Sequence, residues 1–271
     1  MEKLNFLTAG IPNIAKDYSD AFEKLEECSL DGLEVEFVHG VRYSENSRNA
    51  ILSRKNKIIT HHGPYYINLN AKEKDKIEAS IKRVLDTARA AFDLGAYSIT
   101  YHAAFYLGQG SDEVTKTMIE RHREITETLK QENIKVWIRP ETTGKKSQWG
   151  TLDEIIELSK NFETVLPCID FAHIHARENG KFNTYDEFCS ILEKLSNSLG
   201  QVAIDNFHGH VAGIEYGLKG EKKHLIFEES DFNYKDLLKA LKAFNVKGVL
   251  VCESPNIEID AKILKDYYLS L

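Results

Sequence analysis

The chain has 271 residues, of which 42% are hydrophobic and 28% are charged, and its formal net charge at pH 7 is −7. This composition is that of a folded globular protein, and the net negative charge argues against indiscriminate binding to nucleic acid. No signal-peptide pattern precedes the first apolar run, and no run approaches the roughly 18 apolar residues that span a bilayer, so we expect a cytoplasmic protein without membrane association.

Short apolar runs alternate with longer amphipathic runs along the first half of the chain. We predict strands at 4–8, 32–37, 57–60 and 98–101, and helices at 18–27, 46–54, 73–94 and 111–131. The run at 32–37 alternates with period two, as strands do, whereas the helical runs repeat their apolar residues at helical spacing.

The same alternation continues through the second half. We predict strands at 135–138, 165–169, 202–207 and 248–252, and helices at 151–160, 184–199, 234–244 and 260–269. Eight strand–helix units without an intervening linker predict an α/β fold, a (β/α)8 TIM barrel that forms a single domain over residues 1–271. A doubly wound open sheet is the alternative that this alternation leaves open.

Polar residues stand at the ends of the predicted strands, where α/β barrels build their active sites. Six successive strands end on, or shortly before, at least one imidazole or carboxylate: His61 and His62, His102, Glu141, Asp170 with His173, His208 and His210, and Glu253. His224 lies in a following loop. Imidazole and carboxylate together are ligands of zinc, manganese and iron. Each residue alone is more typical of a rim residue or a helix cap, but the six together predict a metal site at the C-terminal mouth.

Several of these residues lie in strings that resemble the endonuclease IV family of abasic-site endonucleases. Residues 62–69 resemble its His-x-x-Tyr-x-Ile-Asn-Leu string, and 141–144, followed by Gly150 and Leu152, its Glu-x-Thr-x-Gly segment. Residues 168–173 resemble its Ile-Asp-x-x-His string, and 251–255 its closing strand and glutamate. The similarity runs in order from the third to the eighth predicted strand and is much weaker over residues 1–60.

The resemblance implies a cluster of about two to three zinc ions per chain, with manganese or iron as an alternative in one position. Carried over, His62 and His102 bind one metal, and Glu141 bridges it to a second. The second metal is completed by Asp170, His210 and Glu253, and the third is bound by His173 and His224. We prefer His210 to its neighbour His208 because residues 210–214 align better with the family's string, and His208 stays the alternative.

One departure from the family concerns the third metal. The family places an aspartate two residues before its last histidine, and this chain has Lys222 there. An ammonium group cannot ligate a metal. Glu221 can replace the aspartate only if the segment is irregular, because one step along an extended strand turns a side chain to the opposite face. We expect a third site that is completed by Glu221 or water, or that is partly occupied.

The resemblance implies a monomeric enzyme of base excision repair that acts on double-stranded DNA containing abasic sites. The expected reaction is attack of a metal-activated hydroxide on the phosphodiester 5′ to the lesion, with Glu141 and Glu253 as catalytic residues. Tyr65 and Arg42 match residues that contact the DNA at the lesion. Nearby lysines in the mouth loops are candidates for phosphate contacts: Lys145, Lys146, Lys219, Lys222 and Lys223.

Two other functions fit parts of the pattern. A metal-dependent sugar isomerase or epimerase on a xylose isomerase-like barrel also uses His, Glu and Asp at strand ends, usually for one or two metals. The Asp-x-x-His pair, the string at residues 62–69 and the additional His224 favour the nuclease. A barrel retained as a binding scaffold would be expected to lose metal ligands, and few are lost here.

Overall fold

Eight parallel strands form the central sheet of the computed structural model, which describes residues 1–271. The strands are β1 (Leu4–Ala9), β2 (Gly32–Glu36), β3 (Ile58–His62), β4 (Ser98–Tyr101), β6 (Trp137–Pro140), β8 (Ile169–Asp170), β9 (Phe207–Val211) and β12 (Gly248–Cys252). Their spatial order is β6-β4-β3-β2-β1-β12-β9-β8. The two edges approach each other, because Leu166 and Cys168 donate backbone hydrogen bonds to Ile138 and Pro140 of β6. These bonds close the sheet into the predicted barrel.

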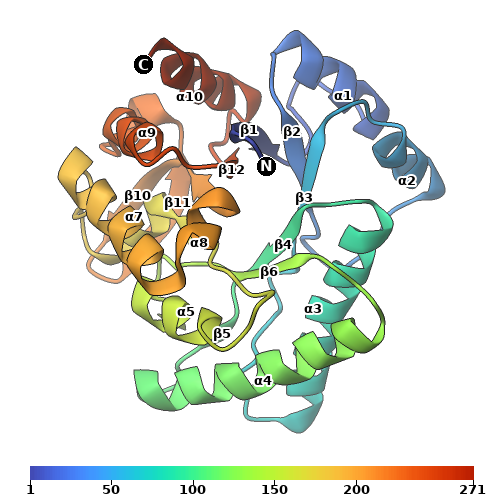
Figure 1. The fold of residues 1–271 in the computed structure, drawn as a ribbon, viewed down its shortest axis with the longest axis vertical. Coiled ribbons are helices and arrows are strands. Elements are labelled where there is room, and N and C mark those ends of the chain that lie inside the picture. The colour runs from blue at the N-terminus through green and yellow to red at the C-terminus, as the bar shows by residue number, and fades with distance from the viewer.

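Helices surround the strands on the outside of the barrel (Figure 1). They are α1 (Tyr18–Glu27), α2 (Glu45–Leu52), α3 (Lys74–Asp93), α4 (Ser111–Gln131), α5 (Leu152–Ser159), α6 (Phe171–Arg177), α7 (Tyr185–Leu199), α8 (Gln201–Asp205), α9 (Tyr234–Ala243) and α10 (Glu258–Ser270), with one 3-10 turn at Phe227–Glu229. None of the ten is both long and apolar enough to cross a lipid bilayer.

Local sequence explains where these helices begin and how they pack. Thr151 and Glu154 form a capping box that starts α5, in which each side chain pairs with the other's backbone N–H. The buried residues of α3 include Ile81, Val84 and Ala88, three and four residues apart on one helix face. Alternating residues of each strand point outward to these helices or inward to the barrel, and this alternation positions the candidate site.

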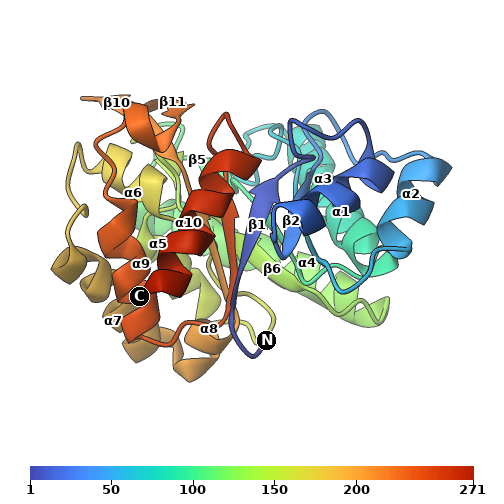
Figure 2. The ribbon, with the colours of Figure 1, turned by 90° about the horizontal axis from the view of Figure 1, so that it is seen from above.

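Two short antiparallel pairs lie in the loops at one end of the barrel. Strand β5 (Ala104–Phe105) pairs with β7 (Gln148–Trp149), and β10 (Gly213–Gly217) pairs with β11 (Gly220–Leu225). Figure 2 shows the β10–β11 hairpin at the end of the barrel opposite the N-terminus. Because β1 starts at the N-terminal end, the hairpin belongs to the mouth at the carboxyl ends of the strands. His224 lies on β11 and not in an irregular loop.

The predicted strand at 202–207 is wrong. Gly200, at φ +78°, separates α7 from α8, and the strand begins only at Phe207. The apolar residues of α8, Ala203 and Ile204, are buried as a single helical turn, and so short a run cannot distinguish a strand from a helix by its period. Two other strands are displaced: β8 covers only the end of 165–169, and β6 lies two residues beyond its predicted start.

Candidate metal centre

Most of the candidate ligands are buried at the mouth. His62, Glu141, Asp170 and His210 are each less than 5% exposed. They come from the ends of β3, β6, β8 and β9, which the closed barrel brings to one rim. His208 and His210 alternate along β9, so both point inward, and His210 lies nearer to the mouth.

Glu141 lies at the centre of this arrangement, and its two oxygens face different imidazoles. Its Oε2 is 3.1 Å from His62 Nε2 and 3.2 Å from His102 Nε2. Its Oε1 is 3.1 Å from His173 Nδ1 and 3.5 Å from His210 Nδ1. A carboxylate whose two oxygens face separate donor sets has the geometry that a bridging ligand needs.

The residues expected around the first two metals lie together. Donor atoms of His62, His102 and Glu141 are within 4.8 Å of one another, as are those of Glu141, Asp170, His210 and Glu253. The Nδ1 of His62 lies 2.8 Å from the Gly63 carbonyl. A proton donated there leaves Nε2 with a lone pair toward Glu141 and His102. One Asp170 oxygen accepts from the His173 backbone N–H, and the other lacks a hydrogen-bond partner.

A third group forms beside the other two from Asp170, His173 and His224. His173 Nδ1 lies 3.0 Å from the Thr142 carbonyl, and its Nε2 faces His224 Nε2 at 3.4 Å and Glu221 Oε2 at 3.5 Å. Glu221 therefore lies beside this group. It offers the anionic side chain that Lys222, at the position of the family's aspartate, does not.

A β-bulge explains how Glu221 reaches this position. The β10–β11 register pairs Glu215 with Lys223 but Tyr216 with Glu221, so Lys222 is the additional residue. The bulge turns Lys222 away, and its Nζ lies 3.0 Å from Glu215 Oε1. Space for Glu221 comes from Gly144, where an added Cβ would lie 2.6 Å from the Glu221 Cβ.

The charges of this region fit divalent cations. Buried atoms of four residues lack hydrogen-bond partners and face the shared space: Glu141 Oε1, Asp170 Oδ2, His210 Nδ1 and Glu253 Oε2. The ion pairs of these carboxylates are all with histidine, and none involves Lys or Arg. Buried carboxylates are costly unless positive charge lies beside them, and either protonated histidines or a coordinated metal supplies that charge.

The proximity of these groups shifts their pKa values. Burial raises the pKa of Glu253 well above its usual value against the opposing effect of His210, and repulsion from Glu141 and Asp170 adds to the rise. Burial lowers the pKa of His62, but Glu36 and Glu141 raise it to about 10. For Glu141, burial acts upward, yet His102 and His210 hold the pKa well below its usual value.

Sequence reasoning missed two carboxylates on β2. Glu34 is fully buried, and its oxygens lie 2.9 Å from His210 Nε2 and 3.1 Å from His208 Nε2. Glu36 lies nearer to the mouth, with one buried oxygen unpartnered, and burial together with Glu34 raises its pKa to about 7. The period-two pattern of residues 32–37 indicates where both glutamates point. A barrel strand has no face toward solvent, so glutamates at alternate positions must point inward.

The proposed DNA-contact residues lie in different places. Tyr65 is 61% exposed beside the cluster, with its ring centroid 5.9 Å from that of His62. Arg42 instead lines a surface hollow with Asp86, Arg89 and Asp93 of α3, and no ion pair or hydrogen bond joins its side chain to the cluster. The candidate lysines are exposed, and the backbone N–H of Lys146 donates to the Lys219 carbonyl, which brings their two loops together.

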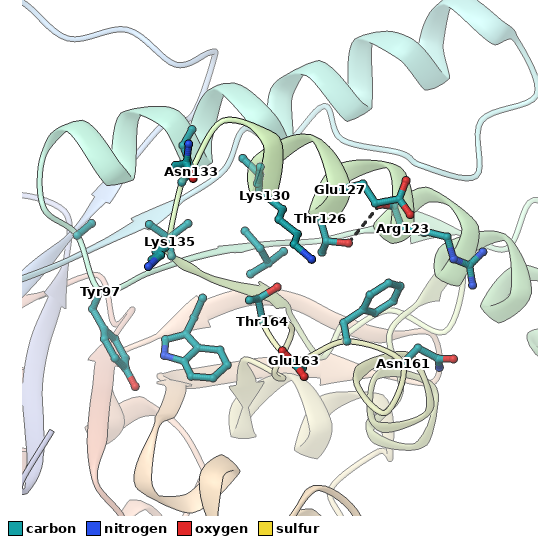
Figure 3. Close-up of a pocket in the computed structure, with 17 residues that line it drawn as sticks. Tyr97, Arg123, Thr126, Glu127, Lys130, Asn133, Lys135, Asn161, Glu163 and Thr164 are labelled. Atoms are coloured by element: carbon teal, nitrogen blue, oxygen red, sulfur yellow. Dashed lines mark hydrogen bonds between the residues drawn. The ribbon is translucent and has the colours of Figure 1, made fainter.

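A pocket of about 940 Å³ lies away from these residues. It opens between α4 and β6, and its lining includes Tyr97, Lys130, Lys135 and Glu163 (Figure 3). None of the clustered histidines or carboxylates lines it. We therefore place the candidate site at the mouth, where the titratable groups converge.

Comparisons with known proteins agree on the fold. A family model described as the xylose isomerase-like TIM barrel matches residues 22–267. An uncharacterized protein of Methanocaldococcus jannaschii is 44% identical over 271 residues, covering 99% of this chain and 98% of that protein. A probable endonuclease 4 of Staphylococcus carnosus is 25% identical over 253 residues, covering 90% and 79%.

Solved structures resemble the chain at lower identity. A D-tagatose 3-epimerase-like protein has a TM-score of 0.74 at 20% identity and covers 97% of both chains. Endonuclease IV from Thermus thermophilus has a TM-score of 0.70 at 15% identity, covering 99% of this chain and 100% of that one. The IolI protein with a bound zinc atom has a TM-score of 0.70 at 14% identity, covering 99% and 95%. At these identities the likeness shows the fold.

Proposed function

The chain belongs to the xylose isomerase-like TIM barrel family, and within that family we propose that it is a metal-dependent phosphodiesterase that cleaves double-stranded DNA on the 5′ side of abasic sites. The relatives named probable endonuclease 4 support this proposal. The observation that carries it is the presence of three adjoining ligand groups, which share Glu141 and Asp170. Shared ligands would hold metals close together, and metals in that arrangement can stabilise the attacking and leaving oxygens of a phosphodiester together.

The proposal assigns each residue at the mouth a role in metal binding or proton transfer. His62 and His102 would hold a first metal, Glu141 would contribute both to it and to a second, and His173, His224 and Glu221 would hold a third. Bound there, divalent metals would stabilise negative charge on the phosphate and lower the pKa of water near it. Glu253, whose Oε2 has no hydrogen-bond partner, would orient the attacking water and accept its proton.

Tyr65 would then contribute to lesion recognition. An exposed aromatic ring beside the cluster can stack where the missing base leaves space. An abasic nucleotide has lost its pairing and stacking, so rotating it out of the duplex costs less than rotating an intact one. The exposed lysines of the 144–146 loop and the β10–β11 hairpin would contact phosphates.

The experiment is a comparison of two duplexes that differ only in one abasic site. The proposal predicts tighter binding of the abasic duplex at one salt concentration, and cleavage that leaves a 3′-hydroxyl. Equal affinity for both duplexes, together with the absence of cleavage by the zinc-loaded protein, would contradict it.

A sugar isomerase or epimerase is the second candidate, and Glu36 is the observation that favours it. This carboxylate faces the mouth near His62 and has no cationic side chain paired with it. Its pKa of about 7 leaves part of this group ionised at neutral pH, and the ionised form opposes the approach of a phosphodiester but not of a neutral sugar. Turnover of ketohexoses by the metal-loaded protein, with no cleavage of abasic DNA, would establish this alternative.

A further inference from the structure

We infer that Glu34 is a positioning residue that holds His210 in the orientation needed to bind a metal. The inference rests on the metal centre of the proposed function, and it concerns metal binding and not the substrate. Glu34 lies on β2 and His210 on β9, two strands that are separated in the sheet by β1 and β12. Their contact therefore crosses the interior of the barrel beneath the ligand groups.

The two nitrogens of His210 face different neighbours. Nε2 lies 2.9 Å from Glu34 Oε1, while Nδ1 lies 3.3 Å from Glu253 Oε1 and 3.5 Å from Glu141 Oε1. A neutral imidazole carries one proton, and the Glu34 carboxylate attracts it to Nε2. Nδ1 then keeps its lone pair toward the group formed with Glu141, Asp170 and Glu253.

The second oxygen of Glu34 faces another imidazole. Its Oε2 lies 3.1 Å from His208 Nε2, and His208 Nδ1 lies 2.8 Å from the Ser98 hydroxyl. Ser98, His208 and Glu34 are all 2% exposed or less. No Lys or Arg side chain pairs with the Glu34 carboxylate, so its negative charge acts on the two imidazoles.

A competing role for the same residues is direct ligation. Donor atoms of Cys168, His208 and His210 also lie within 4.8 Å of one another. If a metal occupied that position, His208 would be a ligand and Glu34 would not act through His210. The test must therefore separate loss of the carboxylate from loss of the His208 imidazole.

The first variant is Glu34→Gln, which replaces the negative carboxylate beside the two imidazoles with a neutral amide of the same size. Replacing the acceptor behind a metal-binding histidine weakens metal affinity by about 10- to 100-fold. We expect a loss of this size for one zinc in competition with a chromogenic chelator. Zinc affinity within about threefold of wild type would overturn the inference, whereas failure of the wild-type protein to cleave abasic DNA would contradict only the proposed function.

The matched control is His208→Gln, which keeps an N–H for Glu34 but removes the imidazole. The inference predicts an unchanged zinc stoichiometry, and loss of one zinc would show that His208 ligates. A second measurement needs only the zinc-loaded wild-type protein. Nitrogen-15 NMR should show His210 protonated at Nε2 and metal-bound at Nδ1, and the reverse assignment would contradict the inference even if Glu34→Gln fails to fold.

Discussion

Charged side chains are buried at both ends of the barrel interior, but the groups that surround them differ. At the end opposite the mouth, Arg139 is 1% exposed and donates to the Pro167 and Asn206 carbonyls. Its guanidinium carbon also lies 5.5 Å from the ring centroids of both Tyr97 and Trp137. At the mouth, the carboxylates face only histidines and one another, and several of their oxygens lack partners.

We interpret Arg139 as a charge with a structural role and the carboxylates at the mouth as candidate metal ligands. The Arg139 guanidinium finds carbonyls and aromatic rings within the protein, and of its nitrogens only Nε lacks a hydrogen-bond partner. At the mouth, the positive charge beside the carboxylates comes from histidines, whose protons a bound divalent metal would replace. Changes at the two ends should therefore affect different properties.

The largest effect is expected from Glu141→Gln. A neutral amide is a poor bridging ligand, so turnover of abasic duplex should fall by more than about 100-fold, while circular dichroism shows an intact fold. Steady-state cleavage assays at saturating zinc provide the measurement. Activity within about tenfold of wild type, or roughly 1.4 kcal/mol of activation barrier, would remove Glu141 from the bridging role.

Arg139→Met should lower the stability of the fold but leave metal binding unchanged. The buried carbonyl of Pro167 and the partly buried carbonyl of Asn206 lose their donor, and the free energy of unfolding should fall by about 2–4 kcal/mol in urea denaturation. The number of bound metals should not change, because Arg139 contacts none of the candidate ligands. A loss of metal without a loss of stability would mean that the two ends are coupled.

The pH dependence of zinc affinity tests the charge of the mouth without any mutation. In the metal-free protein, Glu36 and Glu141 overcome the effect of burial and raise the pKa of His62 to about 10, so it is protonated at neutral pH. A metal binds only neutral imidazole, and zinc affinity should rise as pH increases toward that value, by about tenfold per unit for each proton displaced. Calorimetry in buffers of different ionisation enthalpy measures the released protons, and binding without proton release would contradict this account.

Glu221→Ala should have the smallest effect. If the bulge makes Glu221 a ligand, this variant loses one metal per chain and keeps the others, as measured by elemental analysis. Lys222→Ala is the matched control, because the bulge directs Lys222 to Glu215 and away from the ligand group. Equal stoichiometry in Glu221→Ala and wild type would show that water or another group completes the third position.

The strand–helix alternation was sufficient to predict the barrel, because each unit has its own hydrophobic period. It could not predict that α8 precedes β9, since Val202 to Ile204 suits either element. Strand-end positions identified residues that the closed barrel brings together, such as His62, Glu141 and Asp170. The role of each as a metal ligand stays a prediction.

Interactions between distant strands were harder to predict. Glu34 lies on β2 and contacts β9, a pairing that depends on barrel closure and not on local sequence. The bulge at Lys222 depends on how β10 and β11 pair, so the sequence indicated only that Glu221 required an irregularity. In both cases the three-dimensional register decides which side chain faces the site.

The central claim is that the mouth holds a cluster of divalent metals, and the metal content of the purified protein tests it most directly. Elemental analysis after removal of loosely bound ions should find about two to three zinc ions per chain, or zinc with one manganese or iron. The stoichiometry should fall in Glu141→Gln and remain unchanged in Arg139→Met. A protein that retains one metal or none after saturation with zinc would contradict the account.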